Sequence, residues 1–437
     1  MITSPAWKGC KYAVLGLARS GRATVNALLA AGADVTAWDE REDARQDFAN
    51  RVTLADPVAA DLTGFDGVVV SPGVPLNTHP IKPHADRFGV PVIGDIELFA
   101  QARASLPPHK VVGITGTNGK STTTALVHHI LKQAGVPTTM GGNIGLPILE
   151  QQPIPEGGVY VLELSSYQID LTYSLDCDVA VLLNITPDHL DRYDGDFDAY
   201  AASKSRLFAM QTRGHNSIAR FTDARSLGQF AEGSIASILE DVLANRGIAP
   251  AEQADWPSLQ GPHNLENAAA AIEACDILGL SVEQIRAGLR SFPGLPHRME
   301  RVGERAGVLY VNDSKATNTA AAAPALAAFD KIHWIVGGQA KEPGLGETEQ
   351  HLGHVTAAYT IGEAGEIFAE ALTPHCVVSR CGTLDKAVEL ASQVARSGET
   401  VLLSPACASF DQFRDFEDRG DQFRQLVRQL ADSEASL

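Results

Sequence analysis

The stretch that most constrains the fold is GITGTNGKST, residues 113–122, which lies between the apolar pair Val111-Val112 and a helical apolar pattern through residues 125–130. This order predicts a strand, a phosphate-cradling loop and a helix. Glycines permit the tight turn and expose backbone N–H groups to an anion, while Lys120 reaches the terminal phosphates and Ser121 can hold magnesium. The stretch therefore indicates nucleoside triphosphate chemistry.

The loop departs from the general P-loop pattern at one position. Ile114 stands where that pattern has its first glycine, so Gly116 must supply the turn. A loop rich in Gly, Ser and Thr before a helix is also compatible with a plain connection that ends in a helix cap. The other candidate residues decide between the two interpretations.

Length and charge limit the class of protein. A chain of 437 residues exceeds what one core usually supports and predicts roughly three domains. Its 44% hydrophobic and 20% charged residues are typical of a globular protein. The net charge of −18 opposes binding to nucleic acid or to an anionic membrane through a general field. A phosphate-rich ligand would have to meet local positive charge and magnesium.

The cysteines and the apolar runs point to a cytoplasmic protein. The six cysteines form neither a CxxC pair nor a zinc-like cluster, which favours reduced thiols. No signal sequence is recognisable at the start, and no apolar run approaches the length that spans a bilayer. We therefore expect a soluble cytoplasmic protein without membrane insertion.

The first block of the chain has a Rossmann-like beginning. A strand pattern at 12–15, a turn at 16–21 and a helical pattern lead to a second strand that ends at Asp39. Ala18 replaces the middle glycine of the dinucleotide fingerprint, so NAD binding is only an alternative. Asp39 could accept hydrogen bonds from a ligand or simply be a solvated strand end. The turn at 71–75 could likewise admit a phosphate.

Two Pro-rich stretches, 106–110 and 292–298, suggest domain boundaries. We therefore expect an α/β protein of three domains: a Rossmann-like N-terminal domain (1–103), a central P-loop ATPase domain with a parallel sheet (104–298) and a Rossmann-like C-terminal domain (299–437).

In the central block, candidate catalytic side chains follow the ends of predicted strands. A buried-strand pattern at 159–162 leads to Glu163, and a second one at 179–183 leads to a run that contains His189. Both strands should end at the ligand-binding edge of one sheet. Magnesium prefers oxygen ligands, so a lone histidine there is more often a hydrogen-bonded loop residue. Together with the phosphate loop, however, the two residues indicate a metal-assisted phosphoryl-transfer site.

Other candidates have a plain structural alternative. Lys204 lies on a probable helix, where a solvated surface lysine is the simplest interpretation. Asn264 and Asn267 could cap a helix or contact an adenine ring. In the third block, Asp313, Lys315 and Lys341 follow predicted strands and suit an acidic co-substrate.

These segments together resemble the Mur ligases, the ATP-dependent amino-acid-adding enzymes of peptidoglycan precursor synthesis, and within them the D-glutamate-adding members. The matching segments, in order, are TGTNGKST (115–122), GNIG (142–145), ELSSYQ (163–168), DHLDR (188–192), HN (263–264), HR (297–298), NDSKATN (312–318) and SPACAS (404–409).

The resemblance implies three small-molecule substrates, UDP-N-acetylmuramoyl-L-alanine, D-glutamate and ATP. We also expect a monomer. ATP would phosphorylate the alanyl carboxylate, and the amine of D-glutamate would then attack the acyl phosphate. Two magnesium ions would neutralise the crowded negative charge.

The resemblance also implies residue roles. Lys120, Glu163, His189 and Lys204 fall on the family's catalytic positions, and Lys204 falls on its carbamylated lysine. The metal ligands would be Ser121, Glu163, His189 and the Lys204 carbamate. The ATP site would comprise Gly116, Thr117, Asn118, Gly119, Lys120, Ser121, Thr122, Asn264, Asn267, Arg298 and Asp313. The uridine-nucleotide substrate would contact Ser20, Asp39, Gly73 and Asn143. The amino-acid pocket would comprise Lys315, Thr317, Lys341, Ser409 and Phe416.

Several alternatives remain. The chain lacks the Asp-Asn-Pro-Arg signature of the diaminopimelate- and lysine-adding members, and folylpolyglutamate synthetases would not need a uridine-nucleotide domain. A nucleotide-dependent oxidoreductase would bind NAD or NADP and need no ATP. A non-catalytic ATP-driven interaction module would hydrolyse ATP independently of any amino acid.

Overall fold

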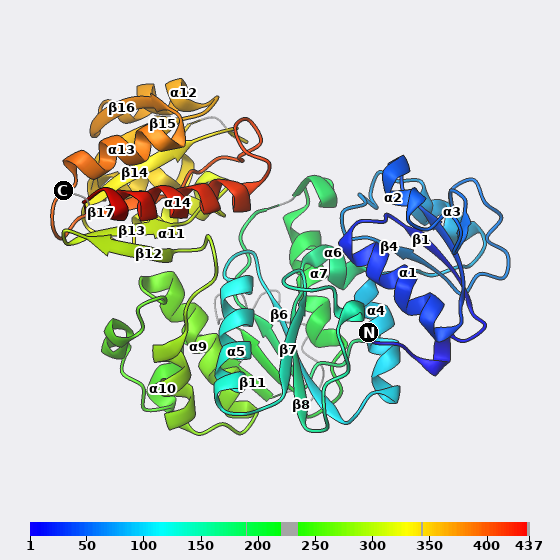
Figure 1. Ribbon diagram of the computed structural model, residues 1–437. Helices are drawn as coiled ribbons and strands as arrows, with labels where there is room; N and C mark the ends of the chain where they lie inside the picture. The colour runs from blue at the N-terminus through cyan, green and yellow to red at the C-terminus, as the bar shows by residue number, and fades with distance from the viewer. Residues whose placement is uncertain (189, 220–234, 342–343, 435–437) are drawn as a thin grey trace. The chain divides into compact units, whose positions relative to one another are not determined.

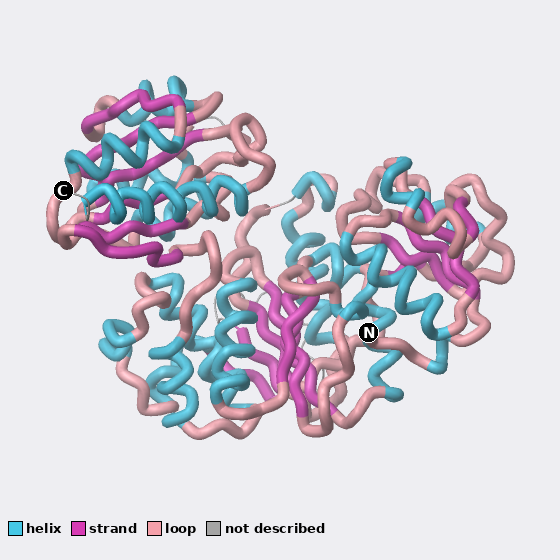
Figure 2. Tube along the Cα trace, in the orientation of Figure 1, coloured by secondary structure: helices cyan, strands magenta, loops and turns pink. Residues whose placement is uncertain are grey.

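The computed structural model describes residues 1–188, 190–219, 235–341 and 344–434 (Figure 1). Contacts divide the chain into two compact units. The first comprises Met1–Ala249 with Glu266–Leu289, and the second comprises Pro250–Leu265 with Arg290–Leu437. Each sheet has helices beside its strands (Figure 2). Every helix in the described ranges is too short or too polar to span a bilayer.

The first sheet lies in the first unit. Its strands are β1 (Lys11–Leu15), β2 (Asp34–Trp38), β3 (Thr53–Leu54), β4 (Gly67–Val70) and β5 (Val92–Ile93). The helices are η1 (Pro5–Trp7), α1 (Arg19–Ala31), α2 (Glu42–Gln46), α3 (Ile81–Arg87), α4 (Asp95–Ala102) and η2 (Arg103–Ser105). The strand order is β3-β2-β1-β4-β5, and all neighbours are parallel.

The apolar runs of this sheet follow from burial on both faces. Tyr12 and Val14 of β1 belong to one hydrophobic cluster, whereas Ala13 and Leu15 belong to another. Successive side chains of a strand point to opposite faces, so both faces must be covered and the strand reads as continuously apolar. Helix α1 ends where Gly32 adopts a left-handed φ of 84°.

The second sheet, also in the first unit, contains the phosphate-loop segment. Its strands are β6 (His109–Thr115), β7 (Thr138–Gly142), β8 (Gly158–Glu163), β9 (Val179–Leu182), β10 (Asn216–Ala219) and β11 (Ile235–Ile238). The helices of this stretch are α5 (Lys120–Gln133), η3 (Ile148–Glu150), α6 (Ser166–Asp170), η4 (Leu190–Tyr193), α7 (Phe197–Ala209), α8 (Leu239–Asn245), η6 (Pro250–Asp255), α9 (Pro262–Ile277) and α10 (Val282–Ser291).

This second sheet is wholly parallel, with the order β11-β10-β9-β6-β8-β7. Strand β6 pairs with both β8 and β9, so that Ile114 lies opposite Glu163 and Thr115 lies opposite Leu182. The three segments that follow these strands therefore begin at the same edge of the sheet.

The third sheet lies in the second unit. Its strands are β12 (Glu300–Arg305), β13 (Val308–Asn312), β14 (Ile332–Gly337), β15 (Val355–Ile361), β16 (Val377–Gly382) and β17 (Thr400–Leu403). The helices are α11 (Thr319–Leu326), η7 (Gly346–His354), α12 (Gly365–Leu372), α13 (Leu384–Val394) and α14 (Phe416–Glu434). The order is β12-β13-β17-β14-β15-β16, in which only the β12–β13 pair of these strands is antiparallel.

The loops that carry the third-domain candidates follow β13, β17 and β14, three adjacent strands. Asn318 caps α11, because its side chain accepts a hydrogen bond from the backbone N–H of Ala321 at 2.7 Å. Asn318 is therefore the N-cap residue of α11.

Candidate active site

The phosphate loop has the backbone that its glycines predict. Gly116 and Gly119 have φ angles of 151° and 84°, and a Cβ atom at Gly119 would overlap the Oδ1 atom of Asn267. Helix α5 begins at Lys120, whose Nζ donates to the carbonyl oxygens of Gly116 at 2.8 Å and Thr117 at 2.7 Å. The lysine thus bonds to its own loop.

Asn184, which follows β9, holds the loop from the neighbouring strand. Its Oδ1 accepts a hydrogen bond from the N–H of Asn118 at 2.8 Å, and its Nδ2 donates to the carbonyl of Asn118 at 3.1 Å. Its own carbonyl accepts from the N–H of Thr117 at 2.9 Å. We did not predict this role. The only signal in the sequence was the position of Asn184 at the end of an apolar run.

Glu163 offers an oxygen that suits a cation. The side chain is 2% exposed, and its Oε1 accepts a hydrogen bond from Asn143 Nδ2 at 3.0 Å. Its Oε2 is buried and has no hydrogen-bond partner among the described residues. A buried carboxylate oxygen without a partner is costly unless a cation or a proton meets it. The residue therefore fits the predicted metal site.

The structure says less about the other predicted metal ligands. Ser121 is 4% exposed and lies in the first turn of α5. His189 lies outside the described residues. Among the residues that the structure does describe, no three His, Cys, Asp or Glu side chains are grouped as a metal site. The predicted set differs from such a group, because two of its members are a serine and a lysine.

Lys204 is buried rather than solvated. It is 2% exposed on α7, its Nζ donates to the carbonyl of Gly116 at 3.0 Å, and the amine lies 4.7 Å from the ring centroid of Tyr200. Burial, and then the nearby Lys120 ammonium, lower the pKa of Lys204 from 10.5 to about 7. The alternative of a surface lysine is therefore wrong, and near neutral pH much of this amine carries no charge.

A cavity of about 300 Å³ connects the first two sheets. It brings together four predicted residues, Gly73, Lys120, Asn143 and Lys204, from both sides of the cavity. Residues that we had not assigned complete its lining: Pro72, Ser165, Ser166, Tyr167, Asp188, Arg192 and Tyr200. Because the phosphate loop and the turn after β4 face one space, a single ligand can touch both.

Two predicted residues of the first sheet lie elsewhere. Ser20 lines a smaller hollow with Ser71. Asp39 accepts hydrogen bonds from the N–H groups of Leu17 at 2.7 Å and Arg41 at 3.0 Å. Asp39 is therefore partly occupied in holding the loop after β1, so its interpretation as a purely solvated strand end is wrong.

The two asparagines of α9 have different partners. Asn264 is 3% exposed and donates from Nδ2 to the carbonyl of Gln260 at 3.0 Å. Asn267 is 5% exposed, and its Oδ1 accepts a hydrogen bond from Thr123 Oγ1 at 3.4 Å. Asn267 thus joins α9 to α5, the helix that carries Lys120.

In the third domain, Asp313 is a buried carboxyl at the end of β13. Its Oδ2 accepts a hydrogen bond from Ser404 Oγ at 2.8 Å, and its Oδ1 accepts one from the N–H of Met299 at 3.1 Å. Burial raises the pKa of Asp313 to about 7, although these two hydrogen bonds and the Arg298 guanidinium oppose the rise. Arg298 lies between two residues with positive φ, His297 at 60° and Met299 at 48°.

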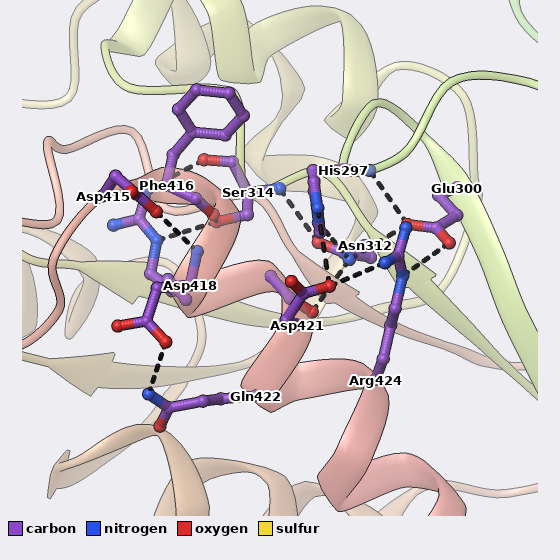
Figure 3. A network of polar contacts seen from close by, with 12 residues as sticks. His297, Glu300, Asn312, Ser314, Asp415, Phe416, Asp418, Asp421, Gln422 and Arg424 are labelled. Atoms are coloured by element: carbon purple, nitrogen blue, oxygen red, sulfur yellow. Dashed lines mark hydrogen bonds and ion pairs between the residues drawn. The ribbon is translucent and has the colours of Figure 1, made fainter.

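Lys315 and Phe416 contact each other, with the Lys315 Nζ 3.9 Å from the ring centroid. A polar network fixes the two segments that carry them (Figure 3). Ser314 Oγ donates to the carbonyl of Phe416 at 2.9 Å. Asn312 Nδ2 donates to the carbonyl of Gly420 at 3.1 Å. The start of α14 is thus held against the loop after β13.

Arg419, which we did not predict, also joins these loops. It is fully buried and donates to the carbonyls of Ser314 at 2.8 Å and Cys407 at 3.1 Å. The loop after β14 is paired with the loop after β17 through mutual hydrogen bonds of 2.9 Å between Gln339 and Ala408. These two loops carry Lys341 and Ser409.

The remaining amino-acid-pocket candidates differ in exposure. Ser409 is 2% exposed, Thr317 is half-buried and Lys341 is exposed. The carbonyl of Ser409 accepts hydrogen bonds from the N–H groups of Gln412 at 3.1 Å and Phe413 at 2.9 Å.

The fold and the cavity are those of a nucleotide-binding α/β protein, and comparison with known proteins defines the family. Family models match residues 10–94 (Mur ligase MurD-like, N-terminal domain), 114–239 (Mur ligase middle domain) and 297–407 (Mur ligase, glutamate ligase domain). The chain belongs to the Mur ligase family, and its predicted three-domain α/β fold is confirmed.

Two curated relatives are similar over nearly the full length. The UDP-N-acetylmuramoylalanine--D-glutamate ligase of Novosphingobium aromaticivorans is 62% identical over 430 residues, covering 98% of this chain and 97% of the relative. The protein of the same name from Sphingopyxis alaskensis is 59% identical over 436 residues, covering 98% and 100%.

Solved structures share the fold at low identity. A MurF ligase from Thermotoga maritima in complex with ADP has a TM-score of 0.60 at 17% identity, covering 97% of this chain and 96% of that one. The UDP-N-acetylmuramate-alanine ligase MurC of the same organism has a TM-score of 0.55 at 18% identity, covering 97% and 99%.

Proposed function

We propose that the protein is an ATP-dependent ligase that adds D-glutamate to UDP-N-acetylmuramoyl-L-alanine and releases ADP and phosphate. The observation that carries the proposal is the cavity in which Lys120, Lys204 and Asn143 face the Gly73 turn, in a chain 62% identical to a ligase of that name. We further propose that it acts in the cytoplasm as a monomer, with domains at 1–103, 104–298 and 299–437.

The chemistry needs an activated carboxylate. An amine does not displace oxide from a carboxylate, whereas phosphate is a good leaving group. The alanyl carboxylate oxygen attacks the γ-phosphorus of ATP, and ADP leaves. The neutral amine of D-glutamate then attacks the acyl carbon, the amide forms and phosphate leaves with the oxygen it received. The amine also gives up a proton.

In this scheme the phosphate loop and Asn143 bind different parts of the substrates. Lys120 exchanges the carbonyls of Gly116 and Thr117 for the phosphate oxygens of ATP. Backbone N–H groups at the start of α5, from Gly119 to Thr122, hold the other phosphate oxygens. Asn143, whose Nδ2 also bonds Glu163, positions the nucleotide substrate in the cavity.

The donor set fits magnesium, two ions of which would neutralise phosphate charge when bound. Glu163 would use its unpartnered Oε2, and Ser121 and His189 would complete the protein ligands. Lys204 would contribute as a carbamate, because a neutral buried amine can add carbon dioxide to give an anionic oxygen ligand. The lowered pKa of Lys204 supports this modification.

The remaining candidates complete three subsites. Ser20, Asp39 and Gly73 would contact the uridine nucleotide. Asn264, Asn267, Arg298 and Asp313 would contact ATP. D-glutamate would be held by Lys315, Thr317, Lys341, Ser409 and Phe416. The two lysine ammonium groups would bind its carboxylates.

The test is phosphate release from ATP by the purified protein with magnesium and UDP-N-acetylmuramoyl-L-alanine. The reaction is run with D-glutamate, L-glutamate, L-lysine or no amino acid. We expect release only with D-glutamate and the nucleotide substrate together. Phosphate release with L-lysine would instead indicate the activity of a lysine-adding member of the family. Phosphate release that does not depend on any amino acid would refute the proposed ligase activity.

A further inference from the structure

We propose that Arg192 is a positioning residue that couples the uridine-nucleotide side of the cavity to η4 and, through it, to Asp188, which lines the cavity with Lys120. The inference rests on the proposed function, because it assumes that the nucleotide substrate occupies the cavity beside Gly73. It concerns how two ligands of one site influence each other, through a side chain in the cavity lining that has no assigned role in binding either ligand.

The geometry of Arg192 joins the first two sheets. Its Nη2 donates to the carbonyl of Gly73 at 2.9 Å, and its Nη1 donates to the carbonyl of Val74 at 3.0 Å. Both acceptors lie in the turn after β4, whereas Arg192 lies on η4, three residues after His189. The guanidinium thus spans from the loop of one sheet to the turn of the other.

The guanidinium rests on a fixed aromatic platform. Its central carbon lies 4.6 Å from the ring centroid of Tyr167, which stacks with Tyr193 at 6.3 Å between centroids. Tyr193 is itself anchored, because its hydroxyl donates to Asp170 Oδ2 at 2.8 Å. A planar guanidinium that stacks on an aromatic ring and donates hydrogen bonds from two nitrogens has a geometry that lysine cannot reproduce.

A second hydrogen bond also joins η4 to the segment after β4. Asn77 Nδ2 donates to the carbonyl of Asp191 at 2.9 Å, so adjacent residues of η4 are both tied to the segment after β4. Asp188, at the other end of the same loop, lines the cavity with Gly73 and Arg192. A ligand that fixes the Gly73 turn therefore also restricts Asp191 and Arg192 of η4, close in the chain to Asp188.

Such a link has a thermodynamic consequence that can be measured. If the nucleotide substrate and magnesium-ATP both bias this loop, each must raise the affinity of the other by the same factor. We expect a factor of about fivefold or more in the wild-type protein. Removing the fork should reduce it to about one without removing either subsite.

Arg206 offers a matched control inside the second sheet's domain. It also donates to two backbone carbonyls, those of Asp170 at 3.4 Å and Thr172 at 2.9 Å, and its guanidinium lies 5.3 Å from the ring centroid of Tyr173. All these partners belong to α6 or the segment directly after it. Its substitution tests the loss of a stacked arginine without the link to Gly73.

The experiment compares wild type, Arg192→Met, Arg192→Lys, Arg206→Met and Arg206→Lys in the full-length protein. Calorimetry measures the affinity for a non-hydrolysable ATP analogue with magnesium, with and without saturating UDP-N-acetylmuramoyl-L-alanine. Steady-state assays give the KM of each substrate. Both Arg192 variants should lose the coupling and raise the KM of the nucleotide substrate by about the same factor, about fivefold or more, while the KM of D-glutamate stays within about twofold. Both Arg206 variants should keep the coupling.

The outcomes separate the two proposals. An active wild type whose Arg192→Met variant keeps the coupling factor would overturn the inference and leave the proposed function intact. Equal loss of coupling in the Arg206 variants would also overturn it, because the effect would then be general destabilisation. A wild type without D-glutamate-dependent activity would refute the proposed function, and the coupling with it.

Discussion

Replacing Lys204 by methionine should change how the stability of the protein depends on pH. Burial and Lys120 lower the pKa of this amine from 10.5 to about 7, so the folded state releases its proton at a lower pH than the unfolded state. Between these values the unfolded state binds more protons, and the free energy of unfolding must rise with pH. Below about pH 7 both states are protonated, and the penalty of the buried ammonium is present in full.

The magnitude follows from the two pKa values. Each unit of pKa difference corresponds to about 1.4 kcal/mol, so the full penalty is about 5 kcal/mol. Raising the pH from about 7.5 to about 9.5 should remove about 2.5 kcal/mol of it. Methionine carries no proton and pays none of this. It also loses the hydrogen bond to Gly116, a roughly constant cost of about 1 kcal/mol.

The assay is guanidinium unfolding of wild type and Lys204→Met at both pH values, in buffers free of carbon dioxide and without nucleotide. Every other titrating group is common to the two proteins, so the change in their difference isolates Lys204. The stability advantage of Lys204→Met over wild type should shrink by about 2.5 kcal/mol as the pH rises. Lys132→Met, at an exposed position of α5, serves as the control and should show no such change. An advantage of Lys204→Met that is the same at both pH values would refute the lowered pKa.

Three further results are expected. Glu163→Gln should retain the hydrogen bond from Asn143 but lower activity about 100-fold or more and raise the magnesium requirement, as a magnesium titration of phosphate release would reveal. The stability of Asp313→Asn relative to wild type should increase by about 2–4 kcal/mol as the pH rises from about 4 to 7, because the folded carboxyl keeps its proton up to about pH 7. A difference in unfolding free energy between the two proteins that is the same at both pH values would contradict this. Gly119→Ala should destabilise the protein by about 1–3 kcal/mol and weaken binding of an ATP analogue, since its φ is 84° and its Cβ would meet Asn267; unchanged analogue affinity would contradict the assigned loop geometry.

The sequence predicted best the features that depend on local order along the chain. Strand, loop and helix at residues 109–133 follow from glycine spacing and apolar pattern, and the structure places β6 and α5 there. The meeting of the phosphate loop with Glu163 could also be predicted. Carboxyl ends of parallel strands share one edge of a sheet, and β6 and β8 are neighbours.

The features that the sequence could not predict depend on which side of an element faces the core. The neighbours of Lys204 on α7, Ser203 and Ser205, are buried as well, although all three are polar. Helical periodicity therefore gave no apolar stripe that would have placed them inside. The roles of Asn184 and Arg192 arise from contacts with segments distant along the chain, which no spacing within their own segments encodes. The metal role of His189 stays a prediction.

The carbonyl of Gly116 links the charge states of Lys120 and Lys204. Lys120 and Lys204 both donate to this oxygen, at 2.8 and 3.0 Å, and one carbonyl cannot neutralise two ammonium groups in a buried site. Burial, and then the charge of Lys120, lower the pKa of Lys204 to about 7, so that this amine is the one that loses its proton. In the proposed function, ATP would change the balance, because phosphate oxygens would replace the carbonyls as acceptors for Lys120. Conversion of Lys204 into a carbamate would change it further, since a cation beside Lys120 would become an anion. Nucleotide binding and modification of Lys204 are thus expected to favour each other through the charge of one loop.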